Sequence, residues 1–224
     1  MRKLAAAVGL TALATVTSSA QQTIFNIPTA DVLGRGKTYL ESDVLWRPQV
    51  PDFALFTERG AYGLGGNVEV GINFGGFLTP DRSSPIATPN IKWQPWHDDK
   101  ISVTTGGFGL FYLRGSGDGK PAVEGYAHAA YKLPTGTRLT AGAYWASSGY
   151  AAAHPAAGAL AGLEQRVNDH LNLIADWLSG KNALGYFTTG ISATLGGWTL
   201  YAGYSFKNGD SKANAMLFEL GFTF

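Results

Sequence analysis

Polar and apolar residues alternate with a period of two along several short stretches of this chain. Successive side chains of a β-strand point to opposite faces, so such spacing predicts a strand with one apolar and one polar face. Similar stretches recur between clusters of Gly, Pro, Asn and Asp, which predicts an all-β chain. The clearest stretch sets Val68, Val70, Ile72 and Phe74 on one face and Asn67, Glu69, Gly71 and Asn73 on the other.

Counting these stretches gives about twelve strands, joined by connections that alternate between tight turns and longer loops. A turn at Asn168 and Asp169 keeps this alternation across residues 148–180. The stretch from Phe53 to Gly63 alternates poorly, and the count becomes ten if it is a loop. Either even count places both ends of the strand array on one side, which in a bacterial membrane barrel is the periplasmic side. The expected strands cover residues 37–47, 53–63, 68–74, 87–95, 101–114, 121–133, 138–147, 158–167, 171–177, 184–195, 198–207 and 214–224, with a loop at 80–85.

The first twenty residues have the composition of a secretory signal peptide. Arg2 and Lys3 supply a positive start, residues 4–16 are apolar, and residues 18–20 form a small-residue cleavage site. Thr and Gly dilute the apolar stretch, whereas a membrane anchor needs about 20 strongly apolar residues. The expected organisation is a signal peptide at 1–20, a periplasmic or lumenal segment at 21–36, and a barrel at 37–224.

The chain ends on an alternating strand that stops at a phenylalanine. Met216, Phe218, Leu220, Phe222 and Phe224 share one face, opposite Glu219, Gly221 and Thr223. This closing strand resembles the C-terminal signature of bacterial outer-membrane β-barrel proteins. The resemblance extends over essentially the whole chain after the signal peptide. It implies a transmembrane, antiparallel up-and-down β-barrel of the small porin-like kind, with the barrel-assembly machinery as a partner that reads Phe222 and Phe224.

The composition agrees with a membrane barrel. Hydrophobic residues make up 45% of the chain at a mean hydropathy of −0.01, which fits neither a helical membrane protein nor a disordered chain. A barrel hides its apolar band in alternate positions, so its average looks ordinary. Loss of Arg2 and Lys3 with the signal peptide lowers Lys and Arg from 17 to 15, one fewer than the 16 Asp and Glu. This balance argues against a nucleic-acid partner.

Five tryptophans fall near the ends of expected strands. Membrane barrels carry aromatic girdles at both interfaces, whereas a soluble sandwich needs a polar outer face on each sheet. We therefore expect outer-membrane lipid and lipopolysaccharide around the wall. The expected girdle residues are Trp46, Trp93, Trp145, Trp177 and Trp198.

The strand faces turned away from the lipid carry charges of both signs. An unpaired buried charge costs several kcal/mol, so these groups must be hydrated or paired. They either line a narrow water-filled channel or pair across the lumen and close it. Barrels of about eight strands are filled by side chains and those of about sixteen are open, so twelve strands are intermediate. The expected lining residues are Glu41, Asp43, Glu69, Asn73, Lys92, Glu124, His128, Lys132, Arg138, Glu164, Arg166, Asp176 and Glu219.

The sequence indicates no catalytic or metal-binding constellation. Outer-membrane phospholipases pair a His with a Ser two residues along a lipid-facing strand, but Ala130 stands two positions after His128. Omptin-like proteases need acidic pairs and an Asp–His pair at the outer rim, where His154 is surrounded by alanines. The His, Asp and Glu residues show no metal-ligand spacing. We therefore expect no enzyme activity, catalytic residue, metal or cofactor.

These observations favour a narrow passive channel for ions or small polar solutes in the bacterial outer membrane. Lumenal Arg and Lys residues set against Glu and Asp would create a transverse field that orients solutes. The rival hypothesis is a closed structural barrel that anchors or binds a partner through its outer loops or wall, as an oligomer or within an envelope complex.

Overall fold

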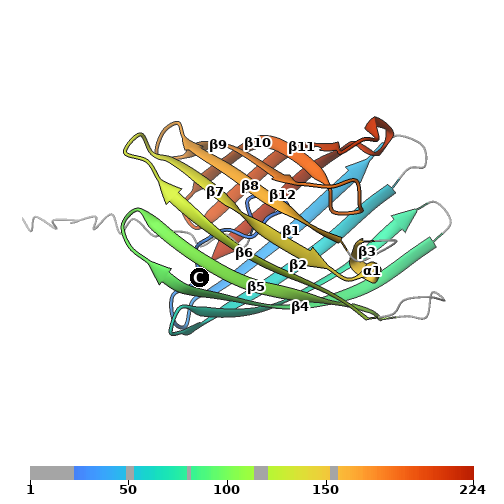
Figure 1. Ribbon diagram of the computed structural model, residues 1–224, viewed down its shortest axis with the longest axis horizontal. Helices are drawn as coiled ribbons and strands as arrows, with labels where there is room; N and C mark the ends of the chain where they lie inside the picture. The colour runs from blue at the N-terminus through green and yellow to red at the C-terminus, as the bar shows by residue number, and fades with distance from the viewer. Residues whose placement is uncertain (1–22, 49–52, 80–81, 114–120, 152–155) are drawn as a thin grey trace, which may run out of the picture.

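The computed structural model describes residues 23–48, 53–79, 82–113, 121–151 and 156–224. Within them the chain forms a closed antiparallel barrel of twelve strands (Figure 1). The helix α1 (Ser148–Ala151) follows β7, and the 3-10 helix η1 (Ser211–Ala213) precedes β12. No helix in these ranges is long and apolar enough to cross a membrane. The strands are β1 Thr38–Arg47, β2 Phe53–Gly65, β3 Val68–Thr79, β4 Arg82–His97, β5 Ile101–Tyr112, β6 Ala122–Lys132, β7 Thr137–Ala146, β8 Ala156–Arg166, β9 Leu171–Leu178, β10 Tyr186–Leu195, β11 Trp198–Lys207 and β12 Ala215–Thr223.

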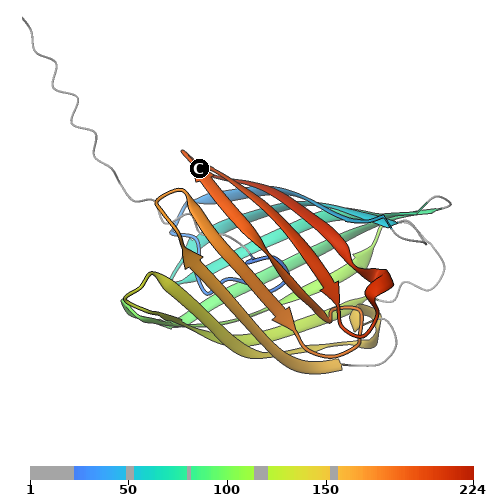
Figure 2. The ribbon, with the colours of Figure 1, turned by 90° about the horizontal axis from the view of Figure 1, so that it is seen from above.

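Each strand pairs with its neighbours in sequence, and the last strand returns to the first. Across the closing seam, β12 lies antiparallel to β1 with Glu219 opposite Asp43. The Phe224 N–H donates to the Thr38 carbonyl at 2.9 Å, so the start of β1 and the end of the chain meet at one rim. Figures 1 and 2 show the strands inclined to the barrel axis, as closure of a sheet requires. The predicted all-β, up-and-down barrel is confirmed.

The two rims of the barrel differ in their connections. The rim that holds Thr38 and Phe224, called the turn rim, joins strands through two to four residues. Between β2 and β3, Gly66 and Asn67 have φ values of 61° and 59°, the conformation of the tight hairpin turn that a Gly-Gly-Asn sequence favours. The opposite rim, called the loop rim, carries α1 and η1 (Figure 1).

The stretch that was ambiguous in sequence forms a regular strand, so the ten-stranded alternative is wrong. β2 pairs residue for residue with β1, and with β3 up to a register shift between Gly63 and Gly65. Arg59 turns into the barrel toward Asp43, whereas Glu58 is exposed on the outside, where it accepts a hydrogen bond from Ser42 at 2.5 Å. The alternation looked poor because this strand carries one charged residue on each face.

The loop expected at residues 80–85 is shorter in the structure. β4 already begins at Arg82, and its residues Ser83, Ser84 and Pro85 pair with β3. Because β3 continues to Thr79, the hairpin extends beyond the residues whose alternation is visible in the sequence. Two prolines and a serine pair had suggested a loop, but a strand can accept Pro where no ladder donor is needed.

The wall has an apolar outside and a largely polar inside. One outward side chain from each strand illustrates the pattern, because all twelve remain 38–52% exposed. The inward positions hold most of the buried polar residues, including Glu69, Lys92 and Asp176. In β1 to β12 order, the outward set is Leu40, Phe56, Ile72, Ile91, Phe111, Val123, Leu139, Leu163, Leu173, Ile191, Leu200 and Phe218.

Residues 23–33, named the lumenal segment, run inside the barrel. Figures 1 and 2 both show this blue stretch between opposite walls. Ile24, Phe25 and Ile27 are at most 1% exposed, so the segment occupies the barrel core. Residues 34–36 are exposed and lead from this segment to β1. The predicted signal peptide at 1–20 lies outside the described residues.

Candidate functional site: the lumen and its segment

A glycine-rich bend carries the chain from the lumenal segment to the wall. The Gly36 N–H donates to the Gly63 carbonyl at 2.9 Å, and the Gly63 N–H donates to the Lys37 carbonyl at 2.9 Å. A Cβ on Gly63 would lie 2.1 Å from the Gly34 carbonyl oxygen. Glycine at position 63 therefore lets the bend lie directly against β2.

Residues 24–27, called the tip of the lumenal segment, surround one buried carboxylate. Asp176 Oδ2 accepts the N–H groups of Phe25, Asn26 and Ile27 at 3.0, 2.5 and 3.0 Å. Its Oδ1 accepts the Asn26 side-chain amide at 2.9 Å. Successive N–H groups that converge in this way form an anion-binding nest. Because Asp176 is only 2% exposed, these donors replace the water that its charge would otherwise need.

Apolar side chains of the tip fill the lumen around this nest. Two glycines of the wall make room for them, because a Cβ on Gly162 would lie 2.6 Å from Ile24 Cδ1 and one on Gly203 would lie 2.7 Å from Phe25 Cζ. The wall is thus shaped to the segment. The buried cluster contains Ile24, Phe25 and Ile27 with Tyr126, Tyr144, Leu160, Ile174, Leu178, Tyr201 and Leu217.

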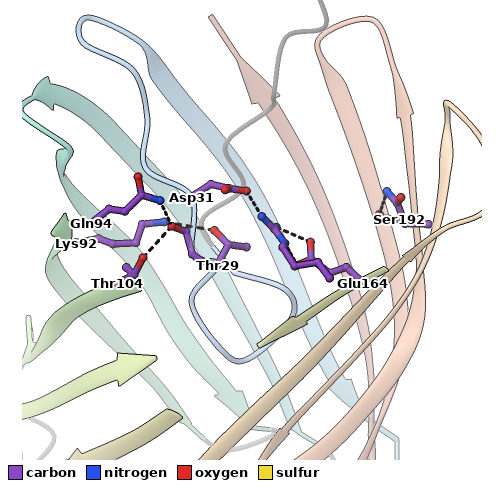
Figure 3. Close-up of polar contacts among 10 residues, drawn as sticks. Thr29, Asp31, Lys92, Gln94, Thr104, Glu164 and Ser192 are labelled. Carbon is purple, nitrogen blue, oxygen red and sulfur yellow. Dashed lines mark hydrogen bonds and ion pairs between the residues drawn. The ribbon is translucent and has the colours of Figure 1, made fainter. Parts of the chain in front are cut away.

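Polar side chains of the wall hold the backbone of the segment beyond its tip. The Ala30 carbonyl accepts hydrogen bonds from Gln94 Nε2 at 2.6 Å and from Thr104 Oγ1 at 2.8 Å (Figure 3). The Leu33 N–H donates to Glu69 Oε2 at 2.9 Å. These contacts attach the segment to β3, β4 and β5.

Asp31 attaches the segment to another part of the wall. Its Oδ2 lies 2.5 Å from Arg138 Nη1 of β7. The same guanidinium makes a bidentate contact with Glu164 of β8, at 2.5 and 2.8 Å. Figure 3 shows Asp31 between the Gln94 and Lys92 side of the wall and the Glu164 side. The lumenal segment therefore bridges the barrel.

Three ion-paired positions in the lumen join neighbouring strands without help from the segment. Each involves two residues that stand directly opposite in the ladder, where side chains are closest. The strand register therefore sets these pairs. They are Arg59 with Glu41 at 3.3 Å, Lys92 with Glu69 at 3.0 Å, and Arg138 with Glu164 at 2.5 Å.

The structure places the thirteen sequence-selected lining residues in two groups. Lys132 and Arg166 are exposed at the turn rim, where Arg166 pairs with Asp169. The others lie on the inner face, buried or half-buried, and are Glu41, Asp43, Glu69, Asn73, Lys92, Glu124, His128, Arg138, Glu164, Asp176 and Glu219.

A cavity of about 370 Å³ lies at the turn rim, and its lining includes Asp31 and Arg138. Its rim includes Asp98, whose carboxylate accepts the N–H groups of Ile101 at 2.7 Å and Lys100 at 2.8 Å. These hydrogen bonds lower the pKa of Asp98, which stays charged at neutral pH. The cavity is thus a charged vestibule, and Lys132, Glu164, Arg166 and Asn172 also line it.

Sequence reasoning did not single out three residues that hold the segment: Asn26, Gln94 and Thr104. Gln94 shares the inward face of its strand with Lys92, so its position could have been inferred from the alternation. Thr104 and Asn26 carry no comparable signal, because only the path of the lumenal segment brings them into the site.

Two buried ionisable side chains of the lumen, His128 and Glu219, have no hydrogen-bond partner among the described residues. The His128 ring stacks on Tyr126 at 5.6 Å between centroids and faces the lumen rather than the outside. Glu219 lies beside Glu41 and Asp43, and their carboxylate oxygens come within 4.8 Å of one another. The sequence shows no such cluster, because Glu219 is far from the other two along the chain.

The five tryptophans selected from the sequence all point outward and are 39–52% exposed. Trp96, the sixth, is 60% exposed near the turn-rim end of β4. The tryptophans gather near both ends of the wall. Trp46, Trp145 and Trp177 lie toward the loop rim, and Trp93 and Trp198 toward the turn rim. Their role as a membrane girdle stays a prediction.

The terminal aromatic residues form a row at the turn rim. The Phe222 ring lies 4.6 Å from the Trp198 ring and 4.7 Å from the Phe224 ring, between centroids. Phe224 is 58% exposed. Recognition of Phe222 and Phe224 by an assembly partner stays a prediction.

Comparison with solved structures finds several outer-membrane proteins. The translocator domain of autotransporter NalP from Neisseria meningitidis is 15% identical, with 87% of this chain and 90% of that chain covered and a TM-score of 0.45. Outer membrane phospholipase A from Escherichia coli is 11% identical, with coverages of 84% and 89% and a TM-score of 0.49. A mutant porin of Rh. blastica is 10% identical, with coverages of 84% and 98% and a TM-score of 0.29.

At such identities and scores, none of these likenesses bears on what the chain does. The sequence matches no protein-family model, and no curated protein matches it.

Proposed function

We propose that the protein is a bacterial outer-membrane channel for ions or small polar solutes that its lumenal segment closes at rest. The observation that carries this proposal is that three ion pairs of the lumenal wall join neighbouring strands directly. The segment adds contacts to that wall, but the ion pairs between neighbouring strands do not depend on it.

The outer face of the barrel supports a place in a membrane. Every strand presents a large exposed apolar side chain outward, and tryptophans lie toward both rims. A closed barrel satisfies all of its ladder hydrogen bonds internally, which is the condition for spanning a bilayer with strands. The signal peptide and the C-terminal phenylalanine expected from the sequence favour the outer membrane.

The inner face supports a channel that opens when the segment moves. If the segment left, Lys92 would keep Glu69 and Arg138 would keep Glu164. Most remaining contacts are hydrogen bonds to the segment, which entering water would replace at a net cost of about 0.5–1.5 kcal/mol each. Asp176 would lose its nest but gain water. A wall of this kind tolerates hydration, as a channel requires.

The apolar tip explains why the closed state is favoured at rest. Ile24, Phe25 and Ile27 are all at most 1% exposed. Burial of each such side chain stabilises the closed state by about 1.5–3 kcal/mol. The loss of this burial on opening adds to the cost of the lost hydrogen bonds, so openings of the native barrel are rare and brief.

Single-channel recordings of the purified protein in planar bilayers test this function. We expect the native barrel to open rarely and Asp176→Asn to open more often, because an amide cannot accept all the N–H groups that the carboxylate accepts. Deletion of residues 23–33 should give steady conductance. Asp210→Asn, a change of the same chemistry at an exposed loop-rim position, should behave like the native protein.

The rival function is a closed anchoring barrel, which the deep burial of the segment tip favours. A folded deletion variant with no conductance would rule out the channel and leave this rival. Folding is checked separately by heat-modifiable migration in gels, so that loss of conductance is not confused with loss of the barrel.

A further inference from the structure

Three carboxylates from two strands meet on the inner wall at the seam where the barrel closes. Glu41 and Asp43 come from β1 and Glu219 comes from β12, and all three are at most 4% exposed. Each contributes an oxygen to a group whose members lie within 4.8 Å of one another. Asp43 and Glu219 stand directly opposite in the ladder. Like charges at opposed positions repel, so this cluster needs a compensating cation.

The protein compensates only part of this charge. Arg59 of β2 contacts Asp43 and lies 3.3 Å from Glu41. The Tyr39 hydroxyl donates to Glu41 but carries no charge. One guanidinium set against three carboxylates leaves two negative charges when all are ionised. These contacts are on the Glu41 and Asp43 side of the cluster.

Glu219 supplies a second, independent observation. It is 1% exposed, and neither of its carboxylate oxygens has a hydrogen-bond partner among the described residues. Asp43 Oδ1 also lacks a hydrogen bond within that part of the chain, whereas Glu41 Oε1 lies 3.3 Å from Arg59 Nε. A buried carboxylate anion without donors is strongly unfavourable, so the side chain that β12 brings to this place must bind a cation or take up a proton.

We propose that Glu41, Asp43 and Glu219 bind one divalent cation of the Ca²⁺ class. Carboxylate oxygens are the ligands of hard cations, and Ca²⁺ accepts them in flexible geometry at about 2.3–2.6 Å. Oxygens grouped within 4.8 Å fit around one such ion. Its charge matches the two negative charges that Arg59 leaves. The site is distinct from the channel function and stands whether or not the barrel conducts.

The position of the cluster gives the cation a structural role. Its ligands come from the first and the last strand, so they meet only after β12 has paired with β1. A bound ion therefore stabilises the closed barrel and not the open sheet. It also lies near the lumenal segment, because Arg59 Nη1 reaches Thr23 Oγ1 at 3.4 Å.

Cation binding to the purified, folded full chain tests the proposal. The protein is stripped with EDTA in a non-ionic detergent and titrated with CaCl₂ by calorimetry, and bound calcium is counted after dialysis. We expect one Ca²⁺ per barrel, weaker binding of Mg²⁺, and a higher temperature for the loss of heat-modifiable migration when Ca²⁺ is present. A native protein that binds no Ca²⁺ overturns the site.

Two variants with a matched control localise the ion. Glu219→Gln should weaken Ca²⁺ binding at least tenfold, and Asp43→Asn should do the same if the first variant fails to fold. Glu58→Gln, an exposed glutamate on the outer face of β2, should bind like the native protein. Equal binding by Glu219→Gln and Glu58→Gln would overturn the proposal. The proposal would also be overturned if the Glu219→Gln barrel were more stable than the native protein saturated with Ca²⁺. That result would mean that protons, and not the ion, neutralise the carboxylate cluster of the native protein.

Discussion

At the residue scale, the lumen depends on buried charges that neighbouring strands neutralise. Lys92 and Glu69 are at most 3% exposed and lie 3.0 Å apart. Glu69 also accepts the Leu33 N–H, so one side chain serves both the wall and the lumenal segment. Removing one partner of such a pair leaves an uncompensated charge, whereas removing both does not.

We predict that Lys92→Met destabilises the folded barrel by about 3–5 kcal/mol, because it leaves Glu69 buried without its cation. The double variant Lys92→Met with Glu69→Gln should recover most of this loss, because the neutral amide oxygen can still accept the Leu33 N–H. The measurement is the free energy of unfolding in urea, from lipid vesicles. Arg166→Gln provides a control, since its exposed pair with Asp169 is worth at most about 1 kcal/mol. A Lys92 variant as stable as this control would contradict the prediction.

At the element scale, the fit between the lumenal segment and the strands decides whether the lumen is closed. The Asp176 carboxylate of β9 accepts backbone N–H groups of the segment tip, and Gly203 of β11 leaves space for the Phe25 ring. The Asp176 contact is made to backbone N–H groups, so it does not depend on the identity of a partner side chain. The glycine matters through the volume that it leaves free.

We predict that Gly203→Ala loosens the segment tip, because the added methyl group would overlap Phe25 within the tight core. Overpacking of this kind costs about 1–3 kcal/mol, which corresponds to up to about a hundredfold faster hydrogen exchange at the tip. Exchange followed by mass spectrometry on the peptide that contains residues 24–27 measures it.

Gly125→Ala is the matched control for this experiment, since a Cβ there meets only the Gly106 carbonyl oxygen at 3.9 Å. Unchanged exchange at the tip in Gly203→Ala would mean that Phe25 can move aside without releasing the segment.

At the scale of the whole molecule, one closed sheet has two different faces. The outside carries Ile72 and its counterparts on every strand, and the inside carries the polar lumen. Closure also removes the exposed edges that would otherwise pair with other chains. The apolar outside is stable only if lipid or detergent covers it.

We predict that Ile72→Arg, near the middle of an outward strand face, destabilises the barrel in lipid by about 2–4 kcal/mol. Leu195→Arg, at the end of β10 on the turn rim, should cost no more than about 1 kcal/mol. Urea unfolding from vesicles compares the two. Equal costs at both positions would show that the wall does not span the bilayer with Ile72 in its core.

The alternation of side chains predicted most strands, because neighbouring residues of a strand point to opposite faces and this pattern is visible in the sequence. It also placed Asp176 and Glu219 on the inner face. It was weakest at β2, where Glu58 and Arg59 put a charge on each side, and at residues 83–85, where pairing with β3 overrides the local preference for a loop. Strand pairing is decided between segments, so a single stretch cannot reveal it.

The sequence by itself determined an all-β barrel with a polar inner face, since the period of two is local and does not depend on the neighbouring strand. Only the tertiary structure decided which inward residues meet. It brought Glu219 beside Asp43, because the closing seam joins the two ends of the barrel. It also brought residues 25–27 to Asp176. Both contacts join residues far apart in the chain, and the free energy that selects them belongs to the closed barrel as a whole.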